Sequence, residues 1–232
     1  PLDGSVYVAD TNNHRIQKFD SAGGFLLEWG ESGTGVSEFD LPADVAVAPD
    51  GSVYVADRDN HRIQKFDSAG GFVTEWGKNG TGESEFKKPT GVAVAPDGSV
   101  YVADKDNNRI QKFDSAGGFV TEWGTYGTGE REFDKTSGVA VAPDGSVYVS
   151  DKWNHRIQKF DSAGGFVTEW GENGTGDTQF KRPQRVAVAP DGSVYVAGNH
   201  NHRIQKFTSE GIFVIEWGTN GQGVSEFRFP WG

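Results

Sequence analysis

The sequence contains no cysteine and no methionine. Disulfide bonds and thiolate metal sites are therefore excluded. The missing cysteines leave the redox compartment open, because their absence suits the cytosol and the cell exterior equally. No apolar run approaches the roughly 18 to 20 residues that cross a bilayer as a helix, and the first residues do not resemble a signal peptide. We therefore expect a soluble chain with no membrane partner, in a compartment that the sequence does not specify.

Positive charge is scarce. The 22 Lys and Arg residues face 33 Asp and Glu residues, which gives a formal net charge of −11. Most of this charge belongs to a template of three Asp and one Glu with one Arg and one Lys that recurs along the chain. A sequence-independent grip on nucleic acid needs a basic surface over the phosphates. We therefore expect no nucleic acid among the partners.

Repetition is the main feature that is present. The string DGSVYV begins at Asp3, Asp50, Asp97, Asp144 and Asp191, at a constant step of 47 residues. Only a few architectures use units of about 40 to 50 residues, and no stretch here shows a convincing helical period. The sequence therefore predicts a single domain over residues 1–232, made of five repeats.

Each repeat contains four short segments with strand character. In one copy, Val45–Ala48 is an apolar run that ends in a Pro-Asp-Gly turn, and Ser52–Asp57 is rich in β-branched and aromatic residues. Arg62–Asp67 alternates imperfectly between polar and apolar residues, and Phe72–Trp76 follows a Ser-Ala-Gly-Gly turn. Four antiparallel strands in 47 residues make one propeller blade. We therefore predict an all-β fold, a β-propeller of four-stranded antiparallel blades.

Two recurring motifs resemble those of the NHL-repeat family. The first is NNHRIQKFD at Asn12–Asp20, with related copies at Asp59–Asp67 and Trp153–Asp161, and the second is GVAVAPDG at Gly91–Gly98. The resemblance covers the whole chain and keeps its elements in fixed order. It implies a propeller that commonly has six blades and often serves as a sensor or interaction domain. RNA binding in some animal members, and metal-dependent lyases or lactonases among related propellers, are implied as further possibilities.

The number of strands bears on how the blades close into a ring. The chain has five copies of the second, third and fourth strands but four copies of the inner strand. We predict a five-bladed ring with an imperfect closing blade, in a monomer. The alternatives are part of a six-bladed ring and an oligomeric ring that is closed by another chain at the incomplete blade.

Two groups of residues vary between copies and are the candidate ligand-binding sites. The pair that enters each inner strand differs in every copy and should lie at the channel mouth on the upper face. From this pair we name Asp44, Thr90, Ser137, Gln184, Arg185 and Trp231. The second group lies between the third and fourth blades and combines aromatic residues with Arg, as interface anchors do. It consists of Tyr126, Arg131 and Trp153.

Other recurring residues have structural explanations. Four histidines share one repeat position, so they lie a blade apart and cannot converge on one metal ion. The Asn-His-Arg loops are then closed by hydrogen bonds to their Asp and to nearby backbone, and the tryptophan of each repeat packs between blades. The inner strands, such as Val92–Ala95, contain Val and Ala alone. We expect no catalytic residue, no metal site and no cofactor.

These observations favour a non-enzymatic propeller scaffold that binds a protein, a peptide or a small ligand through its upper loop face. The main alternative is an engineered or recently amplified repeat scaffold with no evolved ligand, because the copies are nearly identical. A metal-dependent lyase or lactonase and an RNA-binding NHL domain are less favoured.

Overall fold

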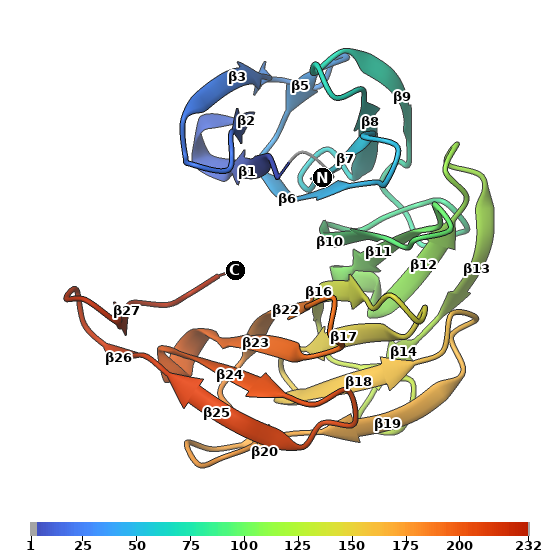
Figure 1. Ribbon diagram of the computed structural model, residues 1–232. Coiled ribbons are helices and arrows are strands. Elements are labelled where there is room, and N and C mark those ends of the chain that lie inside the picture. The colour runs from blue at the N-terminus through green and yellow to red at the C-terminus, as the bar shows by residue number, and fades with distance from the viewer. Residues whose placement is uncertain (1–3, 232) are drawn as a thin grey trace. The chain divides into compact units, whose positions relative to one another are not determined.

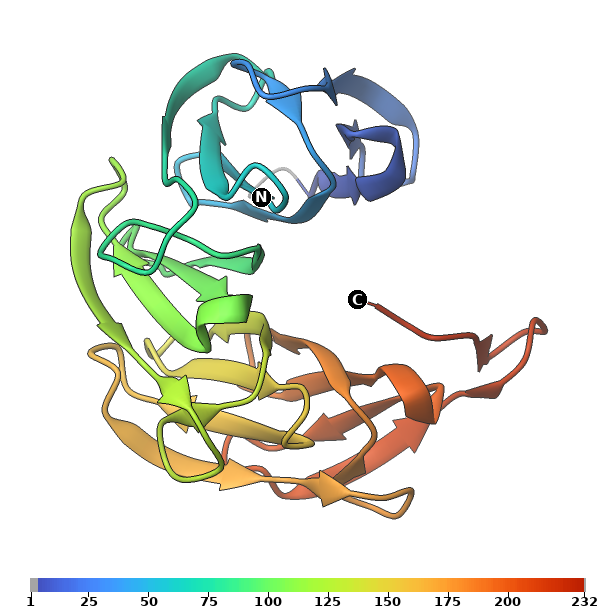
Figure 2. The same cartoon turned by 180° about the vertical axis from the view of Figure 1, so that it is seen from behind.

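The structure, a computed structural model, describes residues 4–231 and divides into two compact units. Unit 1 comprises residues 4–107 and 111–121, and unit 2 comprises residues 108–110 and 122–231. The strands of each blade follow one another in sequence order, as the ribbon colours show from both sides (Figures 1 and 2). The fold is an all-β propeller of five blades, as the sequence predicts.

Four of the blades are four-stranded antiparallel sheets, and blade 1 has three strands in the described part of the chain. Blade 1 contains β1 (Val6–Asp10), β2 (Arg15–Phe19) and β3 (Phe25–Trp29). Blade 2 contains β6 (Pro42–Val47), β7 (Val53–Asp57), β8 (Arg62–Phe66) and β9 (Phe72–Trp76). Blade 3 contains β10 (Pro89–Val94), β11 (Val100–Asp104), β12 (Arg109–Phe113) and β13 (Phe119–Trp123). Blade 4 contains β16 (Thr136–Val141), β17 (Val147–Asp151), β18 (Arg156–Phe160) and β19 (Phe166–Trp170), and blade 5 contains β22 (Pro183–Val188), β23 (Val194–Gly198), β24 (Arg203–Phe207) and β25 (Phe213–Trp217).

The connections between blades contain structure that the sequence did not predict. Short parallel pairs form within them: β4 (Glu31–Ser32) with β5 (Glu38–Phe39), β14 (Thr125–Tyr126) with β15 (Glu132–Phe133), β20 (Glu172–Asn173) with β21 (Gln179–Phe180), and β26 (Thr219–Asn220) with β27 (Glu226–Phe227). Within the described residues, three 3-10 turns follow second strands: η1 (Thr11–Asn13), η2 (Lys105–Asn107) and η3 (Asn199–Asn201). The connections and loops therefore have regular backbone structure that fixes the positions of their side chains.

Aromatic residues pack successive blades together within each unit. In unit 1 the rings of Trp29 and Phe66 lie 5.6 Å apart, and in unit 2 the rings of Trp170 and Phe207 lie 5.8 Å apart. Gly211 has a φ of +81° and lies against Trp170, where a Cβ atom would come within 2.6 Å of the indole. Such aromatic contacts contribute about 0.5–1.5 kcal/mol each beyond area burial. The interpretation of the repeated tryptophan as packing between blades is confirmed for Trp29, Trp76, Trp123 and Trp170, whereas Trp217 contacts Tyr195 of its own blade.

The Asn-His-Arg motif closes its loop around a buried carboxylate. In blade 2 the Asp57 side chain is fully buried and accepts a 2.7 Å hydrogen bond from Arg62 Nε. Asn60 Nδ2 and the backbone N–H of Asp40 also donate to this carboxylate, at 3.0 and 2.8 Å. His61 Nδ1 accepts the backbone N–H of Lys88 at 3.1 Å. The prediction that this loop is closed by its Asp and by nearby backbone is therefore confirmed.

The sequence predicts that one blade lacks its inner strand. Blade 1 is that blade, because its sheet has the order β1-β2-β3 and no inner strand among residues 4–231. Closure of five blades into one ring by a monomeric chain stays a prediction, which native mass spectrometry tests. Among the same residues, no helix has the length and apolar character that a membrane-spanning helix requires.

Candidate binding site

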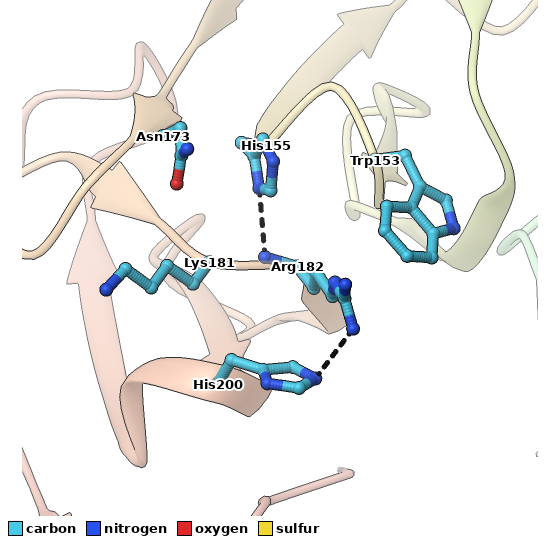
Figure 3. Close-up of a pocket in the computed structure, with 6 residues that line it drawn as sticks. All are labelled: Trp153, His155, Asn173, Lys181, Arg182 and His200. Carbon is cyan, nitrogen blue, oxygen red and sulfur yellow. Dashed lines mark hydrogen bonds between the residues drawn. The ribbon is translucent and has the colours of Figure 1, made fainter.

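A pocket of about 360 Å³ opens within unit 2, where blade 4 is connected to blade 5 (Figure 3). The loop between β17 and β18 supplies Trp153 and His155, and β20 supplies Asn173. Lys181 and Arg182 lie between β21 and β22, and His200 lies on η3. All six residues belong to loops or strand ends on ordered scaffolding, where binding residues are commonly found.

Two backbone positions hold the pocket in shape. His155 and Arg182 have φ angles of 59° and 56°, in the left-handed region that side chains rarely occupy. The backbone N–H of Arg182 donates to His155 Nδ1 at 3.1 Å, and the backbone N–H of His200 donates to the carbonyl of Lys181 at 3.2 Å. These hydrogen bonds join the connection to both neighbouring loops. They compensate for the backbone strain of the two positive φ angles.

The Arg182 guanidinium is placed by two neighbours. Its Cζ atom lies 3.9 Å from the ring centroid of Trp153, which is a cation–π arrangement. Its Nη1 atom lies 3.2 Å from His200 Nε2 (Figure 3). Because a guanidinium can donate but not accept, His200 Nε2 is the acceptor and the neutral ring carries its proton on Nδ1.

Both pocket histidines favour the neutral form. Burial lowers the pKa of His200, and the charges of Arg182, Lys152 and His202 lower it further. Burial also lowers the pKa of His155, with a contribution from Arg182. At neutral pH the pocket therefore combines permanent cations with two uncharged imidazoles.

Five of the residues predicted at the channel mouth, Asp44, Thr90, Ser137, Gln184 and Arg185, lie at the starts of inner strands, and Trp231 lies after β27. In unit 1, Asp44 accepts a 2.9 Å hydrogen bond from the backbone N–H of Val92, two residues after Thr90. In unit 2, Ser137 and Gln184 are buried, with 3% and 6% of their surface exposed. Arg185 pairs with Ala197 in the β22–β23 ladder, and Trp231 is 61% exposed. Their role in ligand binding stays a prediction.

Of the second predicted group, only Trp153 lines the pocket. Trp153, 42% exposed, lies in the pocket, whereas Tyr126 and Arg131 do not line it. Tyr126 is 72% exposed on β14, and the backbone N–H of Arg131 donates to Gln158 Oε1 at 3.1 Å. The sequence predicted that Trp153 meets Arg131 of the connection between blades 3 and 4. Its arginine partner in the structure is Arg182, from the connection between blades 4 and 5.

Five pocket residues were missed: His155, Asn173, Lys181, Arg182 and His200. A signal was available, because Trp153 and His200 occupy one repeat position in consecutive copies, where the second and third copies have Asp59 and Asp106. Among residues 4–231, no three His, Cys, Asp or Glu side chains are grouped as a metal site would require.

Comparisons with known proteins agree with this fold. A family model described as NHL repeat matches residues 3–19, 39–66, 86–113, 133–160 and 180–207, more than half of the chain. The chain belongs to the NHL-repeat family. The Drosophila melanogaster protein brain tumor is 52% identical to it over 42 residues, which are 18% of this chain and 4% of that protein.

Solved propellers with little sequence identity have the same fold. Virginiamycin B lyase from Staphylococcus aureus matches with a TM-score of 0.66 and 14% identity, over 96% of this chain and 73% of the lyase. A chain of the nidogen/laminin complex matches with a TM-score of 0.69 and 15% identity, over 93% of this chain and 76% of its own. U3-55K matches with a TM-score of 0.72 and 10% identity, over all of this chain and 67% of its own.

Proposed function

We propose that this chain is a non-enzymatic NHL binding module and that its loop face takes up a ligand at the blade 4–blade 5 pocket. The observation that carries the proposal is the pairing of Arg182 with Trp153 in a concave site. Arg and Trp are enriched among the residues that dominate binding energy at interfaces. In the other copies Asn12, Asp59, Asp106 and His200 replace the tryptophan, so the repeat itself does not require an aromatic ring there.

Two further observations support a binding role. The segments Val45–Ala48, Val92–Ala95, Val139–Ala142 and Val186–Ala189 of the inner strands consist of Val and Ala, which offer no group for acid–base or nucleophilic chemistry, and polar residues such as Asp44 and Arg185 lie at the strand starts. One similar structure is that of a nidogen/laminin complex, so a propeller of this fold occurs in a protein–protein assembly.

The experiment compares the wild-type chain with the variant Trp153→Asp/His200→Asp in a screen of peptides and small molecules. The variant restores the residues of Asp59 and Asp106, which blades 2 and 3 already accommodate, so it is matched for folding. NMR chemical shifts measure binding. We expect ligands that shift the Trp153 and Arg182 signals in the wild type and that no longer shift the Arg182 signal in the variant. Ligands that bind both proteins equally, or shifts spread evenly over all connections, would contradict the proposal and favour a scaffold without an evolved ligand.

A further inference from the structure

The pocket has lost negative charge relative to the corresponding connection in unit 1. There, Asp59 stands where unit 2 has Trp153, and Arg58 Nε donates to it at 2.9 Å. Burial opposes ionisation of Asp59, but Arg58, with Lys88 and His61, outweighs burial and lowers the pKa of this carboxyl. In unit 1, then, a carboxylate accompanies the cations, and in the pocket an indole takes its place.

The cations of the pocket consequently lack carboxylate partners. Among residues 4–231, neither Lys181 nor Arg182 forms an ion pair with Asp or Glu. The charged groups that shift the pKa of His200 are Arg182, Lys152 and His202, none of which is acidic. On a chain with a net charge of −11, this is a local region of positive potential.

Arg182 is the pocket residue best placed to donate hydrogen bonds to a ligand. Of its five side-chain N–H groups, only the Nη1 contact to His200 is satisfied within residues 4–231. Lys181 extends to the other side of the pocket, away from the guanidinium (Figure 3), so it adds to the potential without meeting the same ligand atoms. Trp153, which is 42% exposed, provides apolar surface beside the guanidinium.

These features select one ligand chemistry. A planar guanidinium with free donors matches a carboxylate, which accepts two parallel hydrogen bonds. The indole next to it favours an acid that carries an apolar group over a hydrated inorganic ion. A long polyanion would meet the acidic remainder of the surface, and its binding is opposed by that charge.

We propose that the blade 4–blade 5 pocket binds a carboxylate with an adjoining apolar group, held by Arg182 and packed against Trp153. The proposal rests on the binding function proposed above and names the ligand class of the same site. A free small acid and an acidic residue beside an aromatic residue in a peptide offer the same chemistry.

The test uses 3-phenylpropionate as the free acid and acetyl-Glu-Phe-amide as the peptide, each titrated into the full chain by NMR. The uncharged control is 3-phenylpropionamide, and inorganic phosphate tests for an unspecific anion site. We expect both carboxylates to shift the Trp153 indole signal, identified with Trp153→Phe, and to bind about tenfold more tightly than the amide, as loss of a charge-assisted hydrogen bond implies. Binding by only one of the two carboxylates supports the proposal and identifies the source.

Arg182→Leu provides the matched variant, because Leu41 occupies this repeat position in the first copy with a similar positive φ. We expect it to weaken carboxylate binding about tenfold, whereas Lys88→Leu in unit 1 leaves the affinity unchanged. Equal or tighter binding of the amide or of phosphate, or an affinity unaltered by Arg182→Leu, would overturn the carboxylate assignment. In that case the binding function survives if other ligands in the screen shift Trp153, and it fails with the assignment if none does.

Discussion

Blades 2 and 5 are built on the same template but differ in how their polar interiors are satisfied. In blade 2, Asp57 accepts hydrogen bonds from Asn60, Arg62 and Gln64. In blade 5, Gly198 replaces this aspartate, and Arg203 Nε and Gln205 Oε1 are buried without partners among the described residues. Asn201 Oδ1 instead accepts the backbone N–H of Lys181.

This difference shows which parts of the repeat can change without loss of the fold. Arg203 keeps its other contacts, to the carbonyls of Thr175, Gly176 and Gln179 and to Glu216 at 2.9 Å. Blade 5 therefore retains its sheet with an incomplete polar network. The blade with the incomplete network also contributes His200 to the pocket, so the change in the polar network and the change in a pocket residue occur in the same copy.

The largest change in unfolding free energy is expected for Asp57→Ala, which removes from blade 2 the carboxylate that blade 5 lacks. The substitution removes the buried carboxylate that accepts from Nε of Arg62, a side chain 8% exposed, and leaves Arg62 paired only with the half-exposed Glu75 at 2.9 Å. Removal of one partner of a buried ion pair costs about 3–5 kcal/mol of unfolding free energy. Denaturant unfolding measures this loss.

The control for that variant is Asp10→Ala in blade 1, where the Asp10 and Arg15 side chains are 22% and 33% exposed. Solvent screens this pair, and we expect a loss of about 1 kcal/mol or less. Equal losses in the two variants would contradict the role assigned to burial.

A smaller effect of opposite sign is expected for Gly198→Asp. Its backbone has a φ of −80°, which any residue can adopt, and an added Cβ comes within 3.3 Å of the Asn201 side chain, which must shift slightly to admit it. The new carboxylate gives Arg203 Nε its missing acceptor, and we expect a gain of about 1–3 kcal/mol. Gly198→Ala separates this gain from the backbone effect; a gain from Ala as large as that from Asp would show that the ion pair is not its source.

The smallest effect concerns the turn after the third strand. In blades 3 and 4, Asp114 and Asp161 each accept two backbone N–H groups at 2.8 Å, whereas Thr208 in blade 5 accepts them at 3.2 and 3.3 Å. The backbone hydrogen bonds lower the pKa of both aspartates. We expect Thr208→Asp to stabilise the chain by about 0.5–1 kcal/mol at neutral pH.

The pH dependence of this variant gives its control. A carboxyl with a lowered folded-state pKa contributes stability that is complete above the unfolded value of about 3.9 and is lost as pH falls through the folded value. The gain from Thr208→Asp should therefore vanish in acid, as thermal unfolding at neutral and at strongly acidic pH measures. A gain that persists in acid would indicate another cause.

The blades could be predicted from the sequence because the residue pattern of each strand is local and recurs in every repeat. The predicted segment Phe72–Trp76 coincides with β9, and the predicted Ser52–Asp57 and Arg62–Asp67 differ from β7 and β8 by one residue each. The parallel pairs of the connections could not be predicted, because two-residue ladders across glycine-rich loops leave no periodic pattern.

Of the residues that line the pocket, the sequence analysis named only Trp153, because a tryptophan stands there in no other copy of the repeat. Arg182 was missed because lysine stands at the same position in the second and third copies, as Lys88 and Lys135, so it resembled scaffold. Its significance depends on neighbours from two loops, and on the absence of the Asp that stands at Asp59. Only the three-dimensional structure brings those side chains together.

The most direct test of the binding site rebuilds it in unit 1 with Asp59→Trp, Lys88→Arg and Asp106→His, beside His61, Asn79 and Lys87, which already match the pocket of unit 2. Isothermal titration calorimetry with 3-phenylpropionate counts the sites. We predict one site in the wild-type chain and two in the rebuilt chain, with both lost when Trp153 and the new tryptophan are each replaced by Asp. An unchanged stoichiometry in a folded rebuilt chain would contradict this prediction.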